Sequence, residues 1–340
     1  MGKHAFALVA ALLSLHGGAA QADPIADFYS GKTVTLLVGF STGGTYDATA
    51  RLLARHMPQH MPGKPTIVVQ NMTGAGGMSE VVHLFNSALR DGSVIGMPPR
   101  AFAIAPFFND KLTYDARKFN ALGSTSPEVA IAVTWHTVPV KRLDDTFTHE
   151  ISVGATAYFD DTGTFPLMVQ KLTGAKIRLV TGYPGGNDIT AAMEKGEVDA
   201  RFAWSWGSIK SRARDWLEQK KINLILQMGV AKAHDLPNTP FIMDYVKNER
   251  DHNAMELLMA PEAAAWPFIT PPAVPKDRVE ALRRAFDATM KDPAFVADAK
   301  KIDIEVEAMS GEQMQAIIDH VLSFDKSVVA RAQDLVKPPQ

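Results

Sequence analysis

Short apolar runs alternate with helical patterns along most of the chain. The strand-like runs lie at residues 34–38, 66–69, 93–97, 129–134, 151–153, 177–180, 198–203 and 223–228. Helical spacing of apolar residues appears at 48–60, 78–89, 164–172 and 188–195, and again at 276–291. Near-continuous apolar strands separated by helices are typical of parallel sheets that helices cover on both faces. The pattern therefore predicts an α/β protein with parallel-type sheets.

The alternation stops after residue 228, where prolines accumulate. They are Pro237, Pro240, Pro261, Pro267, Pro271, Pro272 and Pro275. Proline has no backbone N–H and restricts the residue before it, so it interrupts helices and inner strands. We interpret this stretch as a return path over the surface, which ends where the helical pattern at 276–291 begins.

The first 22 residues have the pattern of an export signal. Lys3 and His4 precede an apolar stretch from residue 5 to 15, and Ala20-Gln21-Ala22 fits the small-x-small cleavage rule. The apolar stretch is too short to span a bilayer, and no later stretch reaches the ~18 uninterrupted apolar residues that a spanning helix needs. We therefore expect cleavage after Ala22 and a periplasmic mature protein.

Length and composition exclude several classes of partner and site. The chain has 340 residues, of which 46% are hydrophobic, enough to bury the cores of two domains. Its 35 basic and 37 acidic residues form no basic cluster. Nucleic acids and anionic membranes attract clustered Lys and Arg, so neither is expected as a partner. The absence of cysteine excludes disulfides, thiolate metal sites and a cysteine nucleophile.

Two Gly-rich loops each follow a strand-like run and lead into a helical pattern. The first Gly-rich loop reads GFSTGGTYD at 39–47, and the second reads NMTGAGG at 71–77. Glycine supplies the φ > 0 conformations with which such loops aim backbone N–H groups, and the positive end of a helix, into one concavity. Two such loops side by side predict an anion site that needs no lysine or arginine of its own.

The first Gly-rich loop also contains a G-x-S-x-G motif, which offers a second interpretation. Ser41 stands between a strand and a helix, as the nucleophile of an α/β-hydrolase does, and several Asp residues and His234 follow it. However, Ser41 comes after the first strand rather than after several, and no HGGG-type oxyanion loop precedes it. A secreted serine hydrolase using Ser41 stays as an alternative function, beside a plain tight turn.

Charged and aromatic residues near strand ends are candidates for contacting the rest of a ligand. Arg100 follows the run at 93–97, and the carboxyl end of a strand in an open α/β sheet lies at the ligand crevice. Arg100 is therefore a candidate partner for a second carboxylate, with a solvated surface arginine as the alternative. The aromatic residues that could wall an apolar ligand body, or simply pack, are Tyr158, Tyr183, Trp204 and Trp206.

Three aspartates near these segments have two interpretations each. Asp47 stands at a helix start, where an acid caps the backbone or complements the helix dipole, but it could also approach a ligand amine. Asp160 and Asp161 precede the helical pattern at 164–172. They either cap that helix or meet a ligand ammonium group.

No metal or cofactor is expected. His56 and His60 have the i,i+4 spacing of two metal ligands, but no third ligand is placed with them, which favours two surface histidines. The run at 74–77 lacks the final spacing of G-x-G-x-x-G, and the chain has no G-x-x-x-x-G-K-[ST] motif. Dinucleotide and nucleoside triphosphate binding are therefore poorly supported.

Several further motifs occur in order along the mature chain. They are FYSGKTV at 28–34, GFSTGGTYDATARLLA at 39–54, VVQNMTGAGG at 68–77, GYPGG at 182–186, MEKGEVD at 193–199, LPNTP at 236–240 and KDP at 291–293. Together they resemble the Bug family, the extracytoplasmic receptors of tripartite tricarboxylate transporters. No single motif is decisive, but the ordered set covers essentially the whole mature chain.

The resemblance implies a fold and a function. The fold is the type II periplasmic-binding-protein fold, in which two α/β domains are joined by two crossovers with a ligand cleft between them. The function is that of a receptor, not an enzyme, which closes on a small organic carboxylate and delivers it to the small and large membrane permease subunits. A ligand-sensing receptor for a membrane kinase is a further alternative. We expect a monomer with domain 1 at 24–124 plus 229–340 and domain 2 at 125–228.

The resemblance also implies a set of ligand-binding residues. In that family, the loops after the first two strands hold a ligand carboxylate through backbone N–H groups and ordered water. The predicted set comprises Ser41, Thr42, Gly43, Gly44, Thr45, Tyr46 and Asp47 from the first Gly-rich loop, Asn71, Thr73, Gly74, Ala75 and Gly76 from the second, Tyr158, Asp160, Thr162, Gly163 and Thr164 from the opposite domain, and Arg100, Tyr183 and Trp204. Thr45, Tyr46 and the Met72-Thr73 pair depart from the family pattern, so the family's ligand preference is not carried over.

Overall fold

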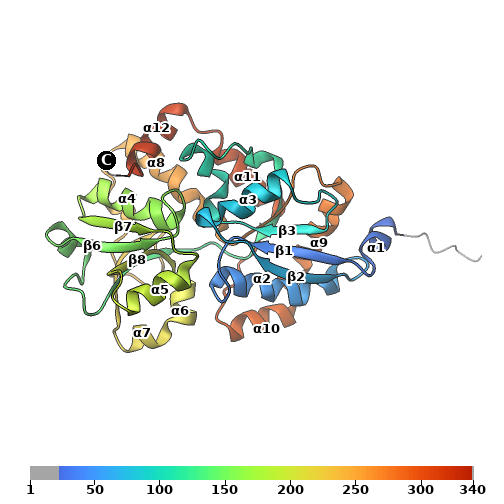
Figure 1. The fold of residues 1–340 in the computed structure, drawn as a ribbon, viewed down its shortest axis with the longest axis horizontal. Coiled ribbons are helices and arrows are strands. Elements are labelled where there is room, and N and C mark those ends of the chain that lie inside the picture. Colours follow the sequence, from blue (N-terminus) through green and yellow to red (C-terminus); the bar gives the residue numbers. More distant parts are fainter. Residues whose placement is uncertain (1–22, 339–340) are drawn as a thin grey trace, which may run out of the picture.

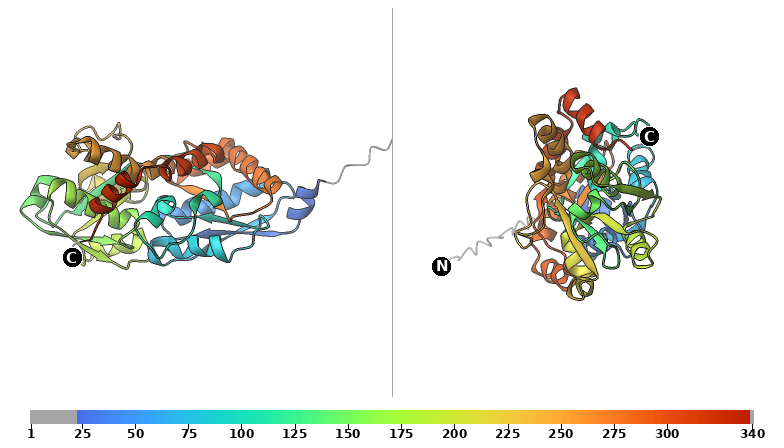
Figure 2. Two further views of the ribbon diagram at one scale, coloured as in Figure 1. Left: turned by 90° about the horizontal axis from the view of Figure 1, so that it is seen from above. Right: turned by 90° about the vertical axis from the view of Figure 1, so that its left-hand side faces the viewer.

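The computed structural model describes residues 23–338, which form two lobes, each built on a β-sheet between helices (Figure 1). Residues 1–22, the expected export signal, lie outside the described residues. The molecule is elongated, and the two lobes follow each other along its long axis (Figure 2). Within residues 23–338, no helix has the length and apolar character that crossing a membrane requires.

The first sheet has six strands in the order β11-β4-β10-β3-β1-β2. They are β1 (Thr33–Val38), β2 (Thr66–Asn71), β3 (Val94–Met97), β4 (Asn120–Ser124), β10 (Pro267–Thr270) and β11 (Met309–Ser310). Strands β2 and β3 both pair parallel to β1, so that Leu36 lies opposite Val69 on one side and Ile95 on the other. Strand β10 runs antiparallel between β3 and β4. Strands β1, β2 and β3 therefore end at the same edge of the sheet, where both Gly-rich loops follow.

The second sheet has five strands in the order β7-β6-β8-β5-β9. They are β5 (Ala130–Trp135), β6 (Ile151–Ala155), β7 (Ile177–Thr181), β8 (Ala200–Ser205) and β9 (Ile222–Met228). Strand β6 pairs parallel with β7 and β8, whereas β5 pairs antiparallel with β8 and β9. The chain passes to this sheet after β4 and returns to the first sheet after β9, so two connections join the two sheets.

Helices cover both faces of each sheet (Figure 1). Those around the first sheet are α1 (Pro24–Tyr29), α2 (Thr45–His56), α3 (Met78–Asn86), α9 (Lys276–Lys291), α10 (Pro293–Lys301) and α11 (Gly311–Val321). Those around the second are α4 (Asp161–Thr173), α5 (Gly186–Glu194), α6 (Trp206–Arg212) and α7 (Arg214–Glu218). Helices α8 (Glu249–Met259) and α12 (Lys326–Leu335) pack on each other, and α12 also packs on α4. The C-terminal part of the chain thus contacts both lobes.

The eight predicted strands are confirmed as β1–β3 and β5–β9, and the five predicted helices as α2–α5 and α9. The prediction of parallel-type sheets is wrong for β5 and β10, which are antiparallel to their neighbours. All six residues of β5 are buried, and a strand buried on both faces is apolar throughout whichever way it runs. The apolar pattern therefore reported burial, not strand direction.

The proline-rich stretch after residue 228 is not a surface return path, contrary to the prediction. It contains α8 and the fully buried strand β10, which fills the middle of the first sheet. Pro267 is the first residue of β10, and Pro271 follows its last residue. Proline is tolerated at the first position of a strand because its missing N–H need not break the ladder there. These prolines therefore mark the ends of the strand instead of excluding it.

A glutamate without a charged partner is buried in the first lobe, on α3. Glu80 is 0% exposed, and neither of its carboxyl oxygens has a side-chain partner among the described residues. It lies between β1 and β3, where ideal Cβ atoms at Gly39 and Gly96 would each come within 2.9 Å of it. Burial raises the pKa of Glu80 well above its usual value, although a hydrogen bond from the Met97 backbone opposes the shift. Burial therefore favours the protonated, neutral form of Glu80.

The raised pKa of Glu80 predicts that its contribution to stability falls as the pH rises. The folded state keeps a proton that the unfolded chain loses above pH 4.5, its ordinary value, so the contribution is full below that pH and declines above it. Glu80→Gln should remove part of this decline, which is at most about 1.4 kcal/mol per pH unit. Urea unfolding at pH 5 and pH 8 measures the change in the free energy of unfolding between these two pH values. Glu218→Gln, which replaces an exposed glutamate, is the control. Equal pH slopes for wild type and Glu80→Gln would contradict the assignment.

Candidate functional site

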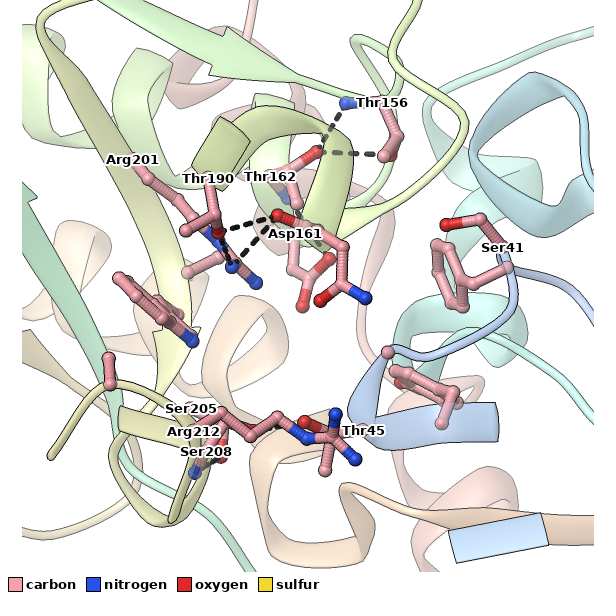
Figure 3. Close-up of a pocket in the computed structure, with 18 of the residues that line it drawn as sticks. Ser41, Thr45, Thr156, Asp161, Thr162, Thr190, Arg201, Ser205, Ser208 and Arg212 are labelled. Carbon is pink, nitrogen blue, oxygen red and sulfur yellow. Dashed lines mark hydrogen bonds between the residues drawn. The ribbon is translucent and has the colours of Figure 1, made fainter. Parts of the chain in front are cut away.

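A cavity lies between the two lobes, where the carboxyl ends of β1, β3, β6 and β7 approach one another. Its volume is about 150 Å³, a size that holds a benzene-sized molecule in other proteins. Its walls are Phe40, Ser41, Gly44, Thr45, Tyr46, Arg100 and Trp266 from the first lobe and Thr156, Asp161, Thr162, Gly186, Asn187, Thr190, Arg201, Ala203, Trp204, Ser205, Ser208, Arg212, Ala213 and Trp216 from the second. Figure 3 shows side chains from both lobes around the same space.

The first Gly-rich loop and the start of α2 form the wall on the side of the first lobe. Helix α2 begins at Thr45 after Gly44, and no side chain caps its N-terminus. Its first backbone N–H groups therefore lack helical acceptors, and the helix dipole places partial positive charge at the same point. Gly43 N–H is already used, because it donates to Asp47 Oδ2 at 2.9 Å. The available donors are thus those of the helix start, beside the cavity.

Three side-chain contacts cross from one lobe to the other around this loop. Ser41 Oγ donates to Asp188 Oδ2 on α5 at 2.8 Å. The hydroxyls of Thr45 and Ser208 lie 2.7 Å apart, with Ser208 on α6. In addition, an Arg212 guanidinium N–H donates to the Gly43 carbonyl. The two lobes are therefore in direct contact at the cavity.

A buried group of charges holds the other side of the cavity. Arg100 lies after β3 and is only 5% exposed. Its Nη1 donates to Glu262 Oε2 at 2.6 Å, and its Nε lies 3.2 Å from Asp161 Oδ2 at the start of α4. Burial raises the pKa of Glu262 to about 8, against the opposing charge of Arg100. Arg100 thus has an acidic neighbour in each lobe, and the Asp161 pair spans the cleft.

Arg201 is a second, half-buried cation at the cavity, and its surroundings differ from those of Arg100. Its Nη1 donates to the Gly186 carbonyl at 2.9 Å and to Thr190 Oγ1 at 2.7 Å, while Nε has no hydrogen-bond partner among the described residues. The guanidinium lies over the Trp204 ring, with its carbon 4.4 Å from the ring centroid. Burial lowers the pKa of Arg201 to about 9, and the Asp161 charge opposes this shift. Arg201 is therefore charged at neutral pH.

Aromatic rings provide most of the apolar lining. Trp204 and Trp216 meet edge to face with centroids 6.2 Å apart on the side of the second lobe. On the other side, Tyr46 lies between Phe40 and Trp266, with centroids at 4.6 and 4.8 Å. Together with the arginines and hydroxyls, these rings make a cavity suited to a small anion with an apolar body.

The structure brings part of the predicted site to this cavity. The predicted residues that line it are Ser41, Gly44, Thr45, Tyr46, Arg100, Thr162 and Trp204. The alternative of a solvated surface position for Arg100 is wrong, because this side chain is buried in ion pairs. Its Nε and Nη1 already face Asp161 and Glu262, so these donors are engaged within the protein.

Several predicted residues of the Gly-rich loops support the site from behind. Asn71 donates to the Phe40 carbonyl at 2.8 Å and to Asp47 at 3.0 Å, and it accepts from Thr42 at 3.2 Å. Asp47 also accepts from Gly43, so these polar groups fix the shape of the first loop. The residues of the second loop that lie at the surface, away from the lining, are Thr73, Gly74 and Ala75.

Gly76, the last predicted residue of the second Gly-rich loop, faces the opposite lobe. An ideal Cβ on Gly76 would lie 2.3 Å from Asp160 Oδ2 and 3.1 Å from the Ala157 side chain. Asp160 itself caps α4, accepting from Gly163 N–H at 3.2 Å. The second Gly-rich loop and the start of α4 are therefore in direct contact, and the cavity lies beside the first loop.

The other predicted residues of the second lobe pack instead of lining the cavity. An ideal Cβ on Gly163 would meet the Ala157 carbonyl at 1.9 Å, so Gly163 permits α4 to lie against the preceding loop. Thr164 Oγ1 donates to the Asp160 carbonyl at 2.8 Å. Tyr183 packs against Gly154, and Tyr158 is 44% exposed in a separate surface groove.

Sequence reasoning missed much of the lining in the second lobe. The lining residues outside the predicted set are Phe40 and Trp266 in the first lobe and Thr156, Asp161, Gly186, Asn187, Thr190, Arg201, Ala203, Ser205, Ser208, Arg212, Ala213 and Trp216 in the second. Asp161 was expected only as a helix cap or as a partner of a ligand ammonium group. Two patterns could have found some of them. Arg201 interrupts an otherwise apolar strand, and Gly186, Asn187 and Thr190 follow the GYPGG motif at the start of α5.

The candidate hydrolase nucleophile Ser41 and the candidate metal ligands His56 and His60 bond to aspartates. The Ser41 hydroxyl bonds to Asp188, not to a histidine, among the described residues. His56 Nε2 lies 3.0 Å from Asp298, and His60 Nε2 lies 2.9 Å from Asp292. The expectation that His56 is a surface residue is wrong, since it is 7% exposed under α10. Residues 23–338 contain no group of three or more His, Asp or Glu side chains placed to hold a metal ion.

Comparison with known proteins identifies relatives along almost the whole chain. Residues 49–333 match the family model described as the tripartite tricarboxylate transporter family receptor. A curated Cupriavidus necator protein, described by its place in the gbd 5′ region, is 20% identical over 339 residues, which are 95% of this chain and 94% of that protein.

Solved structures share the fold. The periplasmic binding protein BugD has a TM-score of 0.71 and 20% identity, with 91% of this chain and 98% of that chain covered. MatC from Rhodopseudomonas palustris with bound malate has a TM-score of 0.69 and 18% identity, with 90% and 99% covered. Another R. palustris protein, with adipate, has a TM-score of 0.67 and 19% identity, with 90% and 96% covered. The predicted two-domain fold of periplasmic binding proteins is thereby confirmed.

Proposed function

The chain belongs to the receptor family of tripartite tricarboxylate transporters, and we propose that it is an exported receptor that captures a small organic carboxylate between its two lobes. The single observation that carries this proposal is the chemistry of the interlobe cavity. It combines the uncapped N-terminus of α2, hydroxyl donors and the charged Arg201 with a lining of aromatic rings. Two relatives of the same fold hold malate and adipate.

Such a cavity gives useful affinity without covalent chemistry. Hydrogen bonds to a charged group contribute roughly 1.5–3 kcal/mol each, and a partly buried helix N-terminus adds up to about 2 kcal/mol. Three or four such donors, after the entropic cost of association, leave about −8 kcal/mol, which corresponds to micromolar binding. In this proposal the ligand carboxylate lies at the first Gly-rich loop and the start of α2, while the second loop contacts α4 in the closed form.

Ligand capture is coupled to closure in this proposal, and the closed receptor presents the ligand to a membrane permease with a small and a large subunit. A ligand stabilises the closed form only through contacts that the open form lacks. The bonds of Ser41 and Thr45 to α5 and α6 are contacts of this kind on the protein side. We further propose that residues 24–124 with 229–340, and residues 125–228, move as the two bodies.

A thermal-shift screen of the mature protein tests the proposal. We expect short mono- or dicarboxylates to raise the melting temperature by several degrees, because ligand at 100 times its Kd adds about 2.7 kcal/mol to the stability of the folded form. The matching uncharged amides are the controls and should give no shift. The opposite result is no shift with any carboxylate, together with ester hydrolysis that Ser41→Ala abolishes; this would replace the receptor by a secreted hydrolase.

A further inference from the structure

The hydrogen bonds of Arg201 leave part of its guanidinium free. Its hydrogen bonds to Gly186 and Thr190 both use Nη1, and Nε is buried without an acceptor among the described residues. A buried donor without an acceptor is destabilising, so this arrangement is incomplete as it stands. The guanidinium points into the interlobe cavity, where a bound molecule would supply the missing acceptor (Figure 3).

The acidic side chains at the cavity form their ion pairs with Arg100 instead of Arg201. Asp161 lines the same cavity, but it forms an ion pair with Arg100 at 3.2 Å. Glu262 also bonds to Arg100, at 2.6 Å. No acidic side chain lies within ion-pair distance of Arg201 among residues 23–338. An anionic ligand group is therefore the partner that the site lacks.

The position of Arg201 separates it from the first carboxylate site. It lies on β8, and Thr190 and Gly186 on α5 hold its Nη1 from one side while the Trp204 ring covers one face. In Figure 3 it stands across the cavity from Ser41, which belongs to the first Gly-rich loop. A guanidinium held in this way forms short, directional bonds to a carboxylate, and a lysine in its place would keep only the point charge.

Resting on the proposed function, we propose that Arg201 is a specificity-determining residue that pairs with a second carboxylate of the ligand, at the opposite end from the carboxylate at α2. The ligand class is therefore a short dicarboxylate. The cavity volume of about 150 Å³ favours a chain of few carbons between the two acid groups. Arg100 forms ion pairs with Asp161 and Glu262 and so links the two lobes. In this proposal the second carboxylate is therefore recognised by Arg201.

The test compares acids that differ by one charge. Titration calorimetry measures the affinity of the mature protein for malonate, succinate and glutarate and for the monoamide of each. Wild type should prefer the best diacid to its monoamide by roughly 10–100-fold, the worth of a charge-assisted pair. Arg201→Gln should remove this preference by weakening the diacid alone, and Arg201→Lys should keep part of it. Arg178→Gln, which removes an exposed arginine on β7, should bind as wild type does.

The outcomes separate the inference from the function on which it rests. If diacid and monoamide bind wild type equally, or if Arg201→Gln weakens both equally, the role of Arg201 is wrong while carboxylate capture stands. If no member of the series or of the wider carboxylate screen binds, the proposed function itself is wrong. Circular dichroism and the melting temperature of each ligand-free variant test whether a change in binding is caused by unfolding. Thr190→Val removes one of the two acceptors of Arg201 Nη1 and so tests separately whether this hydrogen bond positions the guanidinium.

Discussion

Replacing Arg100 by methionine should lower the free energy of unfolding by about 3–5 kcal/mol, the cost of leaving buried acids without their cation. Arg100, Asp161 and Glu262 are 5%, 8% and 1% exposed, so water cannot take the place of the guanidinium. Methionine fills a similar volume, and the loss therefore reports the charge more than a cavity. Urea unfolding of the ligand-free protein at pH 8 measures the effect.

The pH dependence of the Arg100→Met variant gives an independent check. Without the guanidinium, the pKa of Glu262 should rise further, so that the folded variant binds a proton that its unfolded chain releases. Its stability then falls as the pH increases, and its deficit relative to wild type should be larger at pH 8 than at pH 5. The exposed Arg117→Met, which also breaks an ion pair, should leave stability unchanged. If Arg100→Met is as stable as wild type at pH 8, the prediction that Asp161 and Glu262 depend on the Arg100 charge is wrong.

Arg100 also shows what the sequence could and could not predict. Its place after β3 predicted correctly that it would lie at the crevice between the lobes, because the carboxyl ends of strands follow from the strand pattern. Its partner Glu262 is 162 residues away in a stretch that was interpreted as a surface path. A local pattern contains no information on such a pair, so the sequence left open whether this arginine serves a ligand or the protein.

The difference between local patterns and long-range contacts also explains which parts of the cavity wall the sequence predicted. Ser41, Thr45 and the start of α2 follow directly from a strand, a Gly-rich loop and a helix that are adjacent in the chain. Arg201 and Trp266, in contrast, reach the cavity only because β8 and the segment before β10 lie where the sheet order places them. Strand order depends on long-range pairing, which the apolar periodicity of each separate strand does not encode. The wall of the second lobe was therefore the part least accessible to sequence reasoning.

Replacing Gly185 by valine should weaken ligand binding by roughly 100-fold, about 2.7 kcal/mol, through the closed form alone. Gly185 precedes α5 with φ −174° and ψ 177°, an extended backbone that valine also adopts. In the closed arrangement, an ideal Cβ there would lie 2.4 Å from Ser41 Oγ and 3.2 Å from Ser41 N. Because Ser41 belongs to the other lobe, the clash disappears when the lobes separate, and each lobe can stay folded.

Calorimetry with the carboxylate found in the screen, together with small-angle scattering, distinguishes blocked closure from unfolding. The valine variant should keep a cooperative melting transition, somewhat lowered because valine is a poor N-cap, and its radius of gyration should stay larger when ligand is added. Gly185→Ala should have a smaller effect, since the Ser41 hydroxyl can rotate away at the expense of its bond to Asp188. Adding Ser41→Ala to Gly185→Ala removes the nearest clashing atom, so the two changes should couple instead of adding. Wild-type affinity in the valine variant would mean that the ligand-bound receptor does not bring Gly185 against Ser41.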